Sequence, residues 1–269
     1  MKSCYIVDAG LIGYAAAWEL QKHLVAARKA GALEDVLLLC EHPHVITLGR
    51  NGKREHLLAS EQVLRQKGVE FINSDRGGDI TYHGPGQLVG YPILNLGAIR
   101  KDVVWYVRML EEVMIRATAE FGITAERVAG KTGIWVRDTS DSNEPGSSEE
   151  KLGAIGVHIS RWVTSHGFAY NVSTDLRNFD LIVPCGITGR KATSLEKILG
   201  RAVTRKEVVQ PVVQNFGEVF GLEMRETSRD DLLAQLQTWE LNGELNLARA
   251  PAAEIASQEL SSATGRERG

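Results

Sequence analysis

The sequence predicts a mixed α/β (α+β) fold, with mainly antiparallel sheets flanked by helices. Short β-rich runs alternate with longer segments whose apolar residues recur at helical spacing. In one run, Ile155, Val157 and Ile159 alternate with small or polar residues, which is the period of a half-buried strand. The connections between neighbouring runs in this region are too short for helical crossovers, so antiparallel pairing is expected.

The first part of the chain is expected to begin with a helix and to continue mainly as strands. Residues 11–30 have helical spacing and end at Gly31. A second helix is expected at 60–67. The strand-like runs are 36–40, 45–49, 69–73 and 88–96.

The second part contains two helices with recognisable start signals. Asp102 is a predicted N-cap for a helix that ends before Gly122, and Thr204 with Glu207 forms a predicted capping box. The latter helix runs toward Phe220, and Pro211 is expected to kink or split it. Three strands are expected between these helices, at 132–137, 152–162 and 167–172.

Composition excludes several classes of protein. An apolar share of 43% with 24% charged residues excludes global disorder, and a net charge of −3 disfavours nucleic-acid binding. Apolar runs are too short for a transmembrane helix, and Asp8 and Glu19 argue against a signal peptide, so we expect a cytoplasmic protein with no membrane contact. Expected domains are a catalytic domain at 1–224 and a helical or flexible extension at 225–269, with a polar, flexible loop at 138–150 and a disordered tail after Asn242.

The three cysteines lack the spacing of a disulfide framework or a zinc site. Cys4 and Cys40 are interpreted as buried small hydrophobic residues. Close histidines occur only as His42 with His44 and His158 with His166, so no metal site is expected.

A glycine-rich stretch at 76–87 is the first candidate for function. Its glycines allow the main chain to approach a ligand closely, and Arg, Thr, Tyr and His lie in the same stretch. It lacks the Gly-Lys-Ser/Thr ending of a P-loop, and its glycine spacing misses the dinucleotide pattern by one residue.

Lys151 and Cys185 are the second and third candidates. Lys151 is either a solvated lysine at a strand end or an amine made reactive by partial burial. Gly156 and Gly167, on adjacent strands, are expected to open one sheet face to an inserted chain. Cys185 lies between Pro184 and Gly186, where the turn exposes a thiol that a nearby cation would turn into a nucleophile.

Four motifs together resemble those of the lipoyl(octanoyl) transferases, which belong to the biotin/lipoate-protein-ligase superfamily. The resemblance covers about residues 4–222, and the motifs occur in the family's order. They are Arg76-Gly-Gly-x-x-Thr81-x-His83-Gly-Pro-Gly-Gln87, Lys151-x-x-Ala-Ile-Gly156-Val, His166-Gly-x-Ala169-x-Asn-Val and Pro184-Cys185-Gly-Ile. The departures are the polar insertion before Lys151, Gly153 within that motif, and the extended tail.

The resemblance implies a catalytic domain of the biotin/lipoate-protein-ligase type and an acyltransferase acting in lipoate biosynthesis and protein lipoylation. It implies transfer of an octanoyl group from octanoyl-acyl carrier protein to a lysine on lipoyl domains. The acceptors are those of 2-oxoacid dehydrogenase complexes and the H protein of glycine cleavage. No cofactor is implied, and a monomer is expected.

The resemblance also assigns the site. Cys185 carries an acyl-thioester, Lys151 lowers its pKa, and His83 orients the carbonyl or donates a hydrogen bond to the oxyanion. The implied substrate-binding residues are Arg76, Gly77, Gly78, Asp79, Ile80, Thr81, Tyr82, His83, Ala154, Ile155, Gly156, Gly167, Phe168 and Ala169. A basic patch for an acidic carrier protein is expected from Arg50, Lys53, Arg54, Arg76, Arg190 and Lys191.

Two alternatives remain open. An ATP-dependent lipoate- or octanoate-protein ligase would require ATP and Mg²⁺, and its activity would persist without Cys185. Lys131 is the only candidate for its catalytic lysine. A non-catalytic module that binds an acyl chain or a lipoyl domain would bind stoichiometrically without turnover.

Overall fold

A computed structural model describes residues 2–137, 149–183 and 191–249, with side chains up to residue 242. Its contacts divide the chain into two compact units, residues 1–228 and 229–269. The boundary expected after residue 224 falls within a strand, Leu222–Glu226, which belongs to the first unit. The described part of the second unit is one helix, α7 (Arg229–Arg249).

The first unit is built on an eight-stranded sheet in the order β11-β1-β2-β6-β10-β9-β8-β7. Neighbours are parallel from β11 to β2 and antiparallel across the rest, which confirms the mixed, mainly antiparallel arrangement. The strands are β1 (Lys2–Leu11), β2 (Asp35–Glu41), β6 (Gln87–Ile93), β7 (Glu126–Val128), β8 (Lys131–Arg137), β9 (Glu149–Ser160), β10 (Val163–Asn171) and β11 (Leu222–Glu226).

A smaller sheet with the order β4-β3-β5 lies beside the first. Its strands are β3 (Val45–Leu48), β4 (Glu70–Asn73) and β5 (Ile80–His83). A separate apolar cluster packs this sheet against α2 (Glu61–Lys67) and the 3₁₀ helix η2 (Leu176–Leu181). A second 3₁₀ helix, η1 (Arg54–His56), precedes α2.

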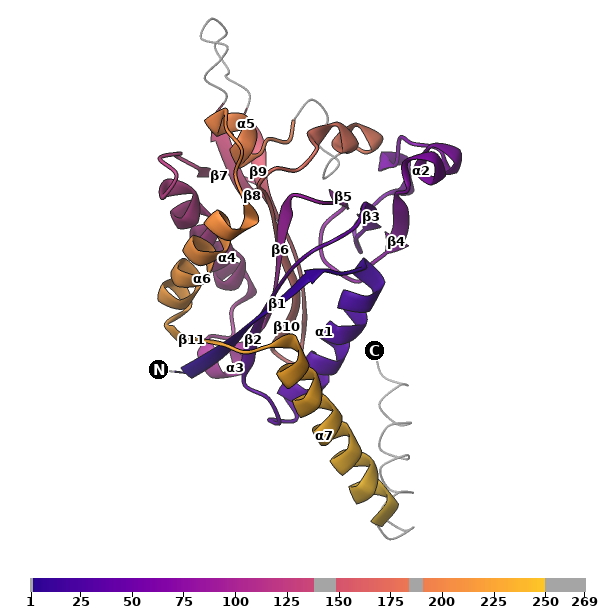
Figure 1. Ribbon diagram of the computed structural model, residues 1–269, viewed down its shortest axis with the longest axis vertical. Coiled ribbons are helices and arrows are strands. Elements are labelled where there is room, and N and C mark those ends of the chain that lie inside the picture. The colour runs from indigo at the N-terminus through magenta and orange to yellow at the C-terminus, as the bar shows by residue number, and fades with distance from the viewer. Residues whose placement is uncertain (1, 138–148, 184–190, 250–269) are drawn as a thin grey trace, which may run out of the picture. The chain divides into compact units, whose positions relative to one another are not determined.

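Helices cover both faces of the large sheet (Figure 1). α1 (Tyr14–Lys29) contacts β6 and β10, whereas α4 (Val103–Ala119) contacts β8, β9 and β10 and packs against α6 (Arg205–Phe220). Between the sheet and the α4–α6 pair lies the main apolar core. The two remaining helices are short, α3 (Leu96–Ile99) and α5 (Leu195–Leu199). Every helix within the described ranges is too short or too polar to traverse a lipid bilayer.

The predicted start signals are confirmed. Asp102 Oδ1 accepts a hydrogen bond from the Trp105 amide at 2.9 Å, and Thr204 and Glu207 form the reciprocal capping box. Pro211 does not split α6, because the helix continues through it with Val208 and Val212 buried on either side.

The structure differs from the expected elements at four places. The strand β1 was not expected; it pairs in parallel with β2 through the crossover helix α1 and with β11 from the far end of the unit. The glycine-rich stretch at 76–87 contains a strand, β5, which was not expected. Of the loop expected at 138–150, residues 138–148 lie outside the described ranges, whereas Glu149 and Glu150 pair with β8 as the start of β9. In the expected tail, residues 243–249 continue α7, and residues 250–269 lie outside the described ranges.

Candidate active site

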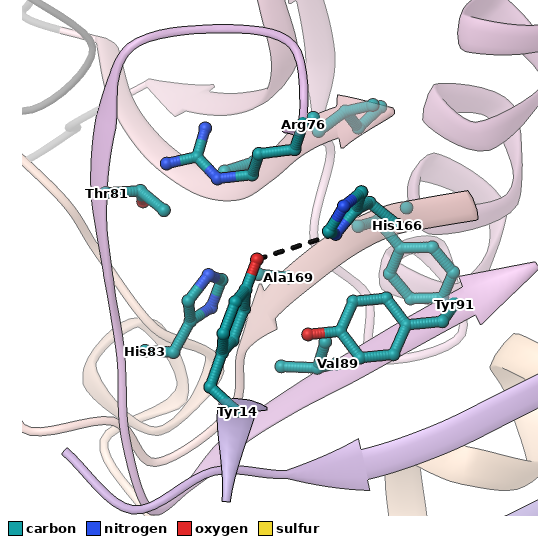
Figure 2. A pocket seen from close by; sticks show the side chains of 13 residues that line it. Tyr14, Arg76, Thr81, His83, Val89, Tyr91, His166 and Ala169 are labelled. Carbon is teal, nitrogen blue, oxygen red and sulfur yellow. Dashed lines mark hydrogen bonds between the residues drawn. The ribbon is translucent and has the colours of Figure 1, made fainter. Parts of the chain in front are cut away.

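A pocket opens where the two sheets meet, and five elements line it. The empty space within it, with the open mouth included, is about 370 Å³. Figure 2 shows polar groups of Tyr14, Arg76 and His83 directed toward the same space. The lining residues are Tyr14, Arg76, Thr81, His83, Val89, Tyr91, Ala154, Ile155, Gly156, His166, Gly167, Phe168 and Ala169.

The structure brings together most of the residues that the sequence singled out as substrate-binding. Those that line the pocket are Arg76, Thr81, His83, Ala154, Ile155, Gly156, Gly167, Phe168 and Ala169. The others, which do not line it, are Gly77, Gly78, Asp79, Ile80 and Tyr82.

The alternation of side chains along strand β5 explains much of this division between residues that line the pocket and residues that do not. Successive side chains of a strand point to opposite faces. Thr81 and His83 therefore face the pocket, whereas Ile80 and Tyr82 join the apolar cluster of the small sheet. Asp79 serves the local loop structure, since its carboxylate accepts hydrogen bonds from the His56 ring and the Ile80 amide.

Gly156 and Gly167 oppose each other across β9 and β10, but their role differs from the expected open sheet face. A Cβ at Gly156 would lie 2.8 Å from the carbonyl oxygen of Gly77, and one at Gly167 would lie 2.1 Å from that of Gly90. These glycines therefore admit a neighbouring backbone, with the Gly77 amide donating to Val157 O at 2.9 Å. The pocket wall depends on this close approach.

Four lining residues were missed by sequence reasoning: Tyr14, Val89, Tyr91 and His166. His166 lies within one of the four motifs, whereas the other three lie on α1 and β6 outside these motifs. The ring of Tyr14 lies 5.9 Å from that of His83 and 6.5 Å from that of His166 (Figure 2). The φ angle of His166, +54°, is left-handed, a rare and strained conformation for a non-glycine residue.

Charged and polar partners hold these missed residues in place. His166 Nε2 donates to Asp75 Oδ1 at 2.7 Å, and this hydrogen bond lowers the pKa of Asp75 to about 2. His158 Nδ1 approaches the other carboxylate oxygen of Asp75 at 2.8 Å. Burial lowers the pKa of His166 itself.

Tyr91 is oriented from behind the pocket by His42. His42 Nδ1 donates to the carbonyl oxygen of Ile12 at 2.7 Å, so its Nε2 accepts a hydrogen bond from the Tyr91 hydroxyl, also at 2.7 Å. Burial lowers the pKa of His42 to about 4 and raises that of Tyr91. Both groups are therefore neutral near pH 7.

His83 and Arg76 occupy the polar end of the pocket. His83 Nδ1 lies 2.7 Å from Gln87 Oε1, and burial lowers the pKa of His83 well below its usual value. Arg76 is buried, and its guanidinium donates to the carbonyl and hydroxyl oxygens of Thr47. Arg76 therefore contributes positive charge inside the pocket rather than to a surface patch, which corrects that expectation.

Cys185 and Arg190 lie outside the described residues, but the chain on both sides of 184–190 is fixed. The amide of Val183 donates to the carbonyl oxygen of His56 at 2.7 Å. On the other side, the Lys151 amide donates to Lys191 O and the Thr193 amide donates to Lys151 O, both at 2.9 Å. Lys151 also holds its ammonium 4.7 Å from the centre of the Trp135 ring.

The other two cysteines are buried, as predicted. Cys4 and Cys40 are both fully buried, and burial raises the pKa of each thiol. Within 2–137, 149–183 and 191–249, no group of three or more His, Cys, Asp or Glu side chains is placed to hold a metal ion.

Comparison with known proteins defines the class of this fold and site. The lipoyl protein ligase A/B catalytic domain family matches residues 13–217. The fold is similar to that of a bipartite lipoate protein ligase from Thermoplasma acidophilum, with a TM-score of 0.67 at 14% identity over 88% of this chain and 92% of that one. A lipoate-protein ligase A solved with ATP gives a TM-score of 0.64, also at 14% identity, over 88% and 94% of the two chains.

Closer relatives narrow the class. The octanoyltransferase of Acidobacterium capsulatum is 51% identical over 245 residues, covering 87% of this chain and 97% of the relative. That of Solibacter usitatus is 50% identical over 224 residues, covering 83% and 96%. The chain belongs to the lipoyl protein ligase A/B catalytic domain family, among its octanoyltransferases. It is accordingly an enzyme, an acyltransferase.

Proposed function

We propose that this enzyme transfers an octanoyl group from octanoyl-acyl carrier protein to a lysine of lipoyl domains, through an acyl-thioester on Cys185. The acceptors are the lipoyl domains of 2-oxoacid dehydrogenase complexes and the H protein of glycine cleavage. The observation that carries the proposal is 51% identity to an octanoyltransferase over nearly its whole length.

Two exchanges complete the reaction without ATP. First, the Cys185 thiolate attacks the donor thioester, a C–S bond forms to Cys185, and the donor's C–S bond breaks as its sulfur takes a proton from the Lys151 ammonium. Next, the acceptor amine attacks the enzyme thioester, a C–N bond forms, and the Cys185 thiolate leaves while the neutral Lys151 amine takes the proton released by nitrogen. The enzyme returns to its starting thiolate and ammonium.

The backbone around Lys151 supports this pairing of roles. Its amide and carbonyl are bonded to Lys191 and Thr193, which follow Cys185 by six and eight residues. The residues that follow the thiol position in the sequence by six to eight places are thus tied to the strand that carries the lysine. An ammonium near a thiol stabilises the thiolate and lowers the thiol's pKa.

The pocket suits an acyl chain with a polar head. Val89, Ile155 and Phe168 provide apolar surface, and Arg76, Tyr14 and His83 gather at the polar part. Seven carbons beyond the carbonyl, at about 0.8 kcal/mol each, contribute roughly 5–6 kcal/mol when buried. One methylene more or less changes transition-state binding by only about 1–3 kcal/mol, so heptanoyl and nonanoyl donors are expected to react more slowly rather than not at all.

The test is an octanoyl-transfer assay with a lipoyl domain as acceptor, octanoyl-acyl carrier protein as donor, and ATP and Mg²⁺ omitted. Wild-type protein is expected to catalyse repeated octanoyl transfer, and Cys185→Ser is expected to lose this activity. Transfer that requires ATP with free octanoate and persists in Cys185→Ser would instead identify a ligase. Binding of the acyl donor without turnover in either case would identify a non-catalytic module.

A further inference from the structure

A hydrogen-bond chain runs from the backbone of Lys151 to the ring of His83. The Thr193 amide donates to Lys151 O at 2.9 Å, and Thr193 O accepts a hydrogen bond from Asn171 Nδ2 at 2.9 Å. Asn171 Oδ1 accepts from Gln87 Nε2 at 2.9 Å, and Gln87 Oε1 contacts His83 Nδ1 at 2.7 Å. The chain links the strand of Lys151 to the pocket through residues that do not themselves line it.

Two backbone carbonyls fix the direction of every hydrogen bond in this chain. A carbonyl oxygen only accepts, so the Asn171 atom facing Thr193 O is its amide nitrogen. Gln87 Nε2 also faces a carbonyl, that of Tyr82 at 3.3 Å, which fixes the Gln87 amide in the same way. Gln87 therefore presents an oxygen to His83, and His83 Nδ1 must carry the proton.

The protonation of Nδ1 decides what the other ring nitrogen can do. In a neutral imidazole only one nitrogen carries a proton, so Nε2 of His83 holds a lone pair. The ring forms part of the pocket wall, and the buried Gln87 lies on its Nδ1 side. Such a nitrogen accepts a hydrogen bond from an N–H group and cannot donate one to an oxyanion.

We propose that Gln87 and Asn171 are positioning residues that hold His83 as its Nδ1–H tautomer, so that Nε2 accepts a hydrogen bond from the attacking amine of the acceptor lysine. This tautomer excludes donation of a hydrogen bond to the oxyanion, which was one of the two roles expected for His83. The tautomer follows from hydrogen bonds alone, whereas the amine as its partner rests on the proposed function.

The charges around His83 favour a neutral ring. His42 and Arg76 face it from the β2–β3 connection and the loop before β5, and His166 faces it from β10; positive charge on any of these lowers its pKa. Tyr14 from α1, whose own pKa is raised by burial, stacks on the ring without adding charge near pH 7. The hydrogen bond to Gln87 works in the opposite direction and raises the pKa of His83.

The direct test is the ¹⁵N spectrum of histidine-labelled, substrate-free protein at pH 7, with His83 assigned by its loss in His83→Asn. We expect a protonated, pyrrole-like Nδ1 and an unprotonated, pyridine-like Nε2. A proton on Nε2 overturns the proposal. Because no substrate is present, this result is independent of whether octanoyl transfer is the true reaction.

A matched pair of variants tests the positioning role. Asn171→Ala removes the group that holds Gln87, and Asn178→Ala removes another buried amide, whose donors go to Tyr82 Oη and Asp175 O. Asn171→Ala is expected to shift the His83 ring nitrogens and to reduce kcat roughly tenfold, as expected for loss of one net hydrogen bond. Equal effects of the two substitutions would reduce Asn171 to a structural residue and contradict the proposal.

Gln87→Glu adds a second measurement, the pH dependence of kcat, which a general loss of stability does not shift. A carboxylate beside Nδ1 raises the pKa of His83, so Nε2 is protonated at pH values where the wild-type ring is neutral. The acidic limb of the kcat profile is expected to move to higher pH, with activity restored as pH rises. A uniform loss at all pH values would contradict an acceptor role for His83.

Discussion

Lys151 and Lys131 form a natural pair for comparison, because both ammonium groups lie near the indole of Trp135. They approach the ring centre to 4.7 and 5.5 Å from the neighbouring strands β9 and β8. Only Lys151 pairs through its backbone with the segment that follows Cys185. The two similar side chains are therefore expected to have different roles.

Lys151→Ala is predicted to raise the pKa of the Cys185 thiol and to reduce octanoyl transfer by at least about a hundredfold, because the thiolate loses its cation. Iodoacetamide labelling of Cys185 against pH measures the change. Lys131→Ala removes a charge beside the same ring and is expected to follow the wild-type curve. Coincident labelling curves for all three proteins would refute the role of Lys151, and loss of activity only in Lys131→Ala would favour the ligase.

At the scale of elements, the site depends on how closely β10 approaches β6. The two strands leave no room for a side chain at Gly167, since a Cβ there would lie 2.1 Å from Gly90 O and 2.6 Å from Pro92 Cδ. Both neighbours belong to the backbone or to a rigid ring. Neither moves without shifting strand β6, which also carries the lining residues Val89 and Tyr91.

Gly167→Ala is predicted to lower the free energy of unfolding by about 1–3 kcal/mol and to weaken acyl-donor binding, because β6 and β10 are forced apart. Denaturant titration and KM for octanoyl-acyl carrier protein measure the two effects. Gly13→Ala is the control: its φ is −58° and its Cβ would meet nothing within 4 Å, so stability is expected to change little. Equal stability of the two variants would show that the strands tolerate the added carbon.

Local signals in the sequence predicted most elements but not which residues of a motif face the pocket. The caps at Asp102 and Thr204 were predictable because their hydrogen bonds join residues three apart. The glycines of the 76–87 motif gave no sign of a strand, so the sequence did not predict that Thr81 and Tyr82 point to opposite faces. Motif content alone does not report such alternation.

Contacts between distant segments were beyond local reasoning. Tyr14 enters the pocket from α1 because α1 packs on β10, more than a hundred residues away. Strand β1 is specified by parallel pairing with β11 at the far end of the unit rather than by its own pattern, whose burial follows no simple alternation. The motifs indicated the chemistry of the site, but they did not indicate the packing between distant segments that completes it.

At the scale of the whole molecule, buried histidines make stability depend on pH. The usual pKa of 6.5 is lowered to about 4 at His42 and is also lowered at His83 and His166, with burial the largest cause for each. Between roughly pH 6.5 and pH 4 the unfolded chain therefore binds more protons than the folded one. The free energy of unfolding falls as pH decreases through this window, by about 1.4 kcal/mol per pH unit for each fully neutral histidine.

Chemical denaturation from pH 8 to pH 4 is predicted to show this slope, with a smaller slope in His42→Gln than in wild type. His23 is exposed on α1, and His23→Gln is expected to retain the wild-type slope. Below pH 4 a further loss is expected, because the pKa of Asp75 is lowered to about 2 by its hydrogen bond with His166, and this stabilisation disappears as the carboxylate is protonated. A flat profile between pH 6.5 and pH 4 would contradict neutral buried histidines.

Formation of the acyl-enzyme is best measured by the intact mass of the enzyme after mixing with octanoyl-acyl carrier protein in the absence of ATP, followed by peptide mapping. We predict one added octanoyl group, located on Cys185, that disappears when a lipoyl domain is supplied. An unmodified Cys185 under conditions in which the lipoyl domain becomes octanoylated would contradict the thioester route.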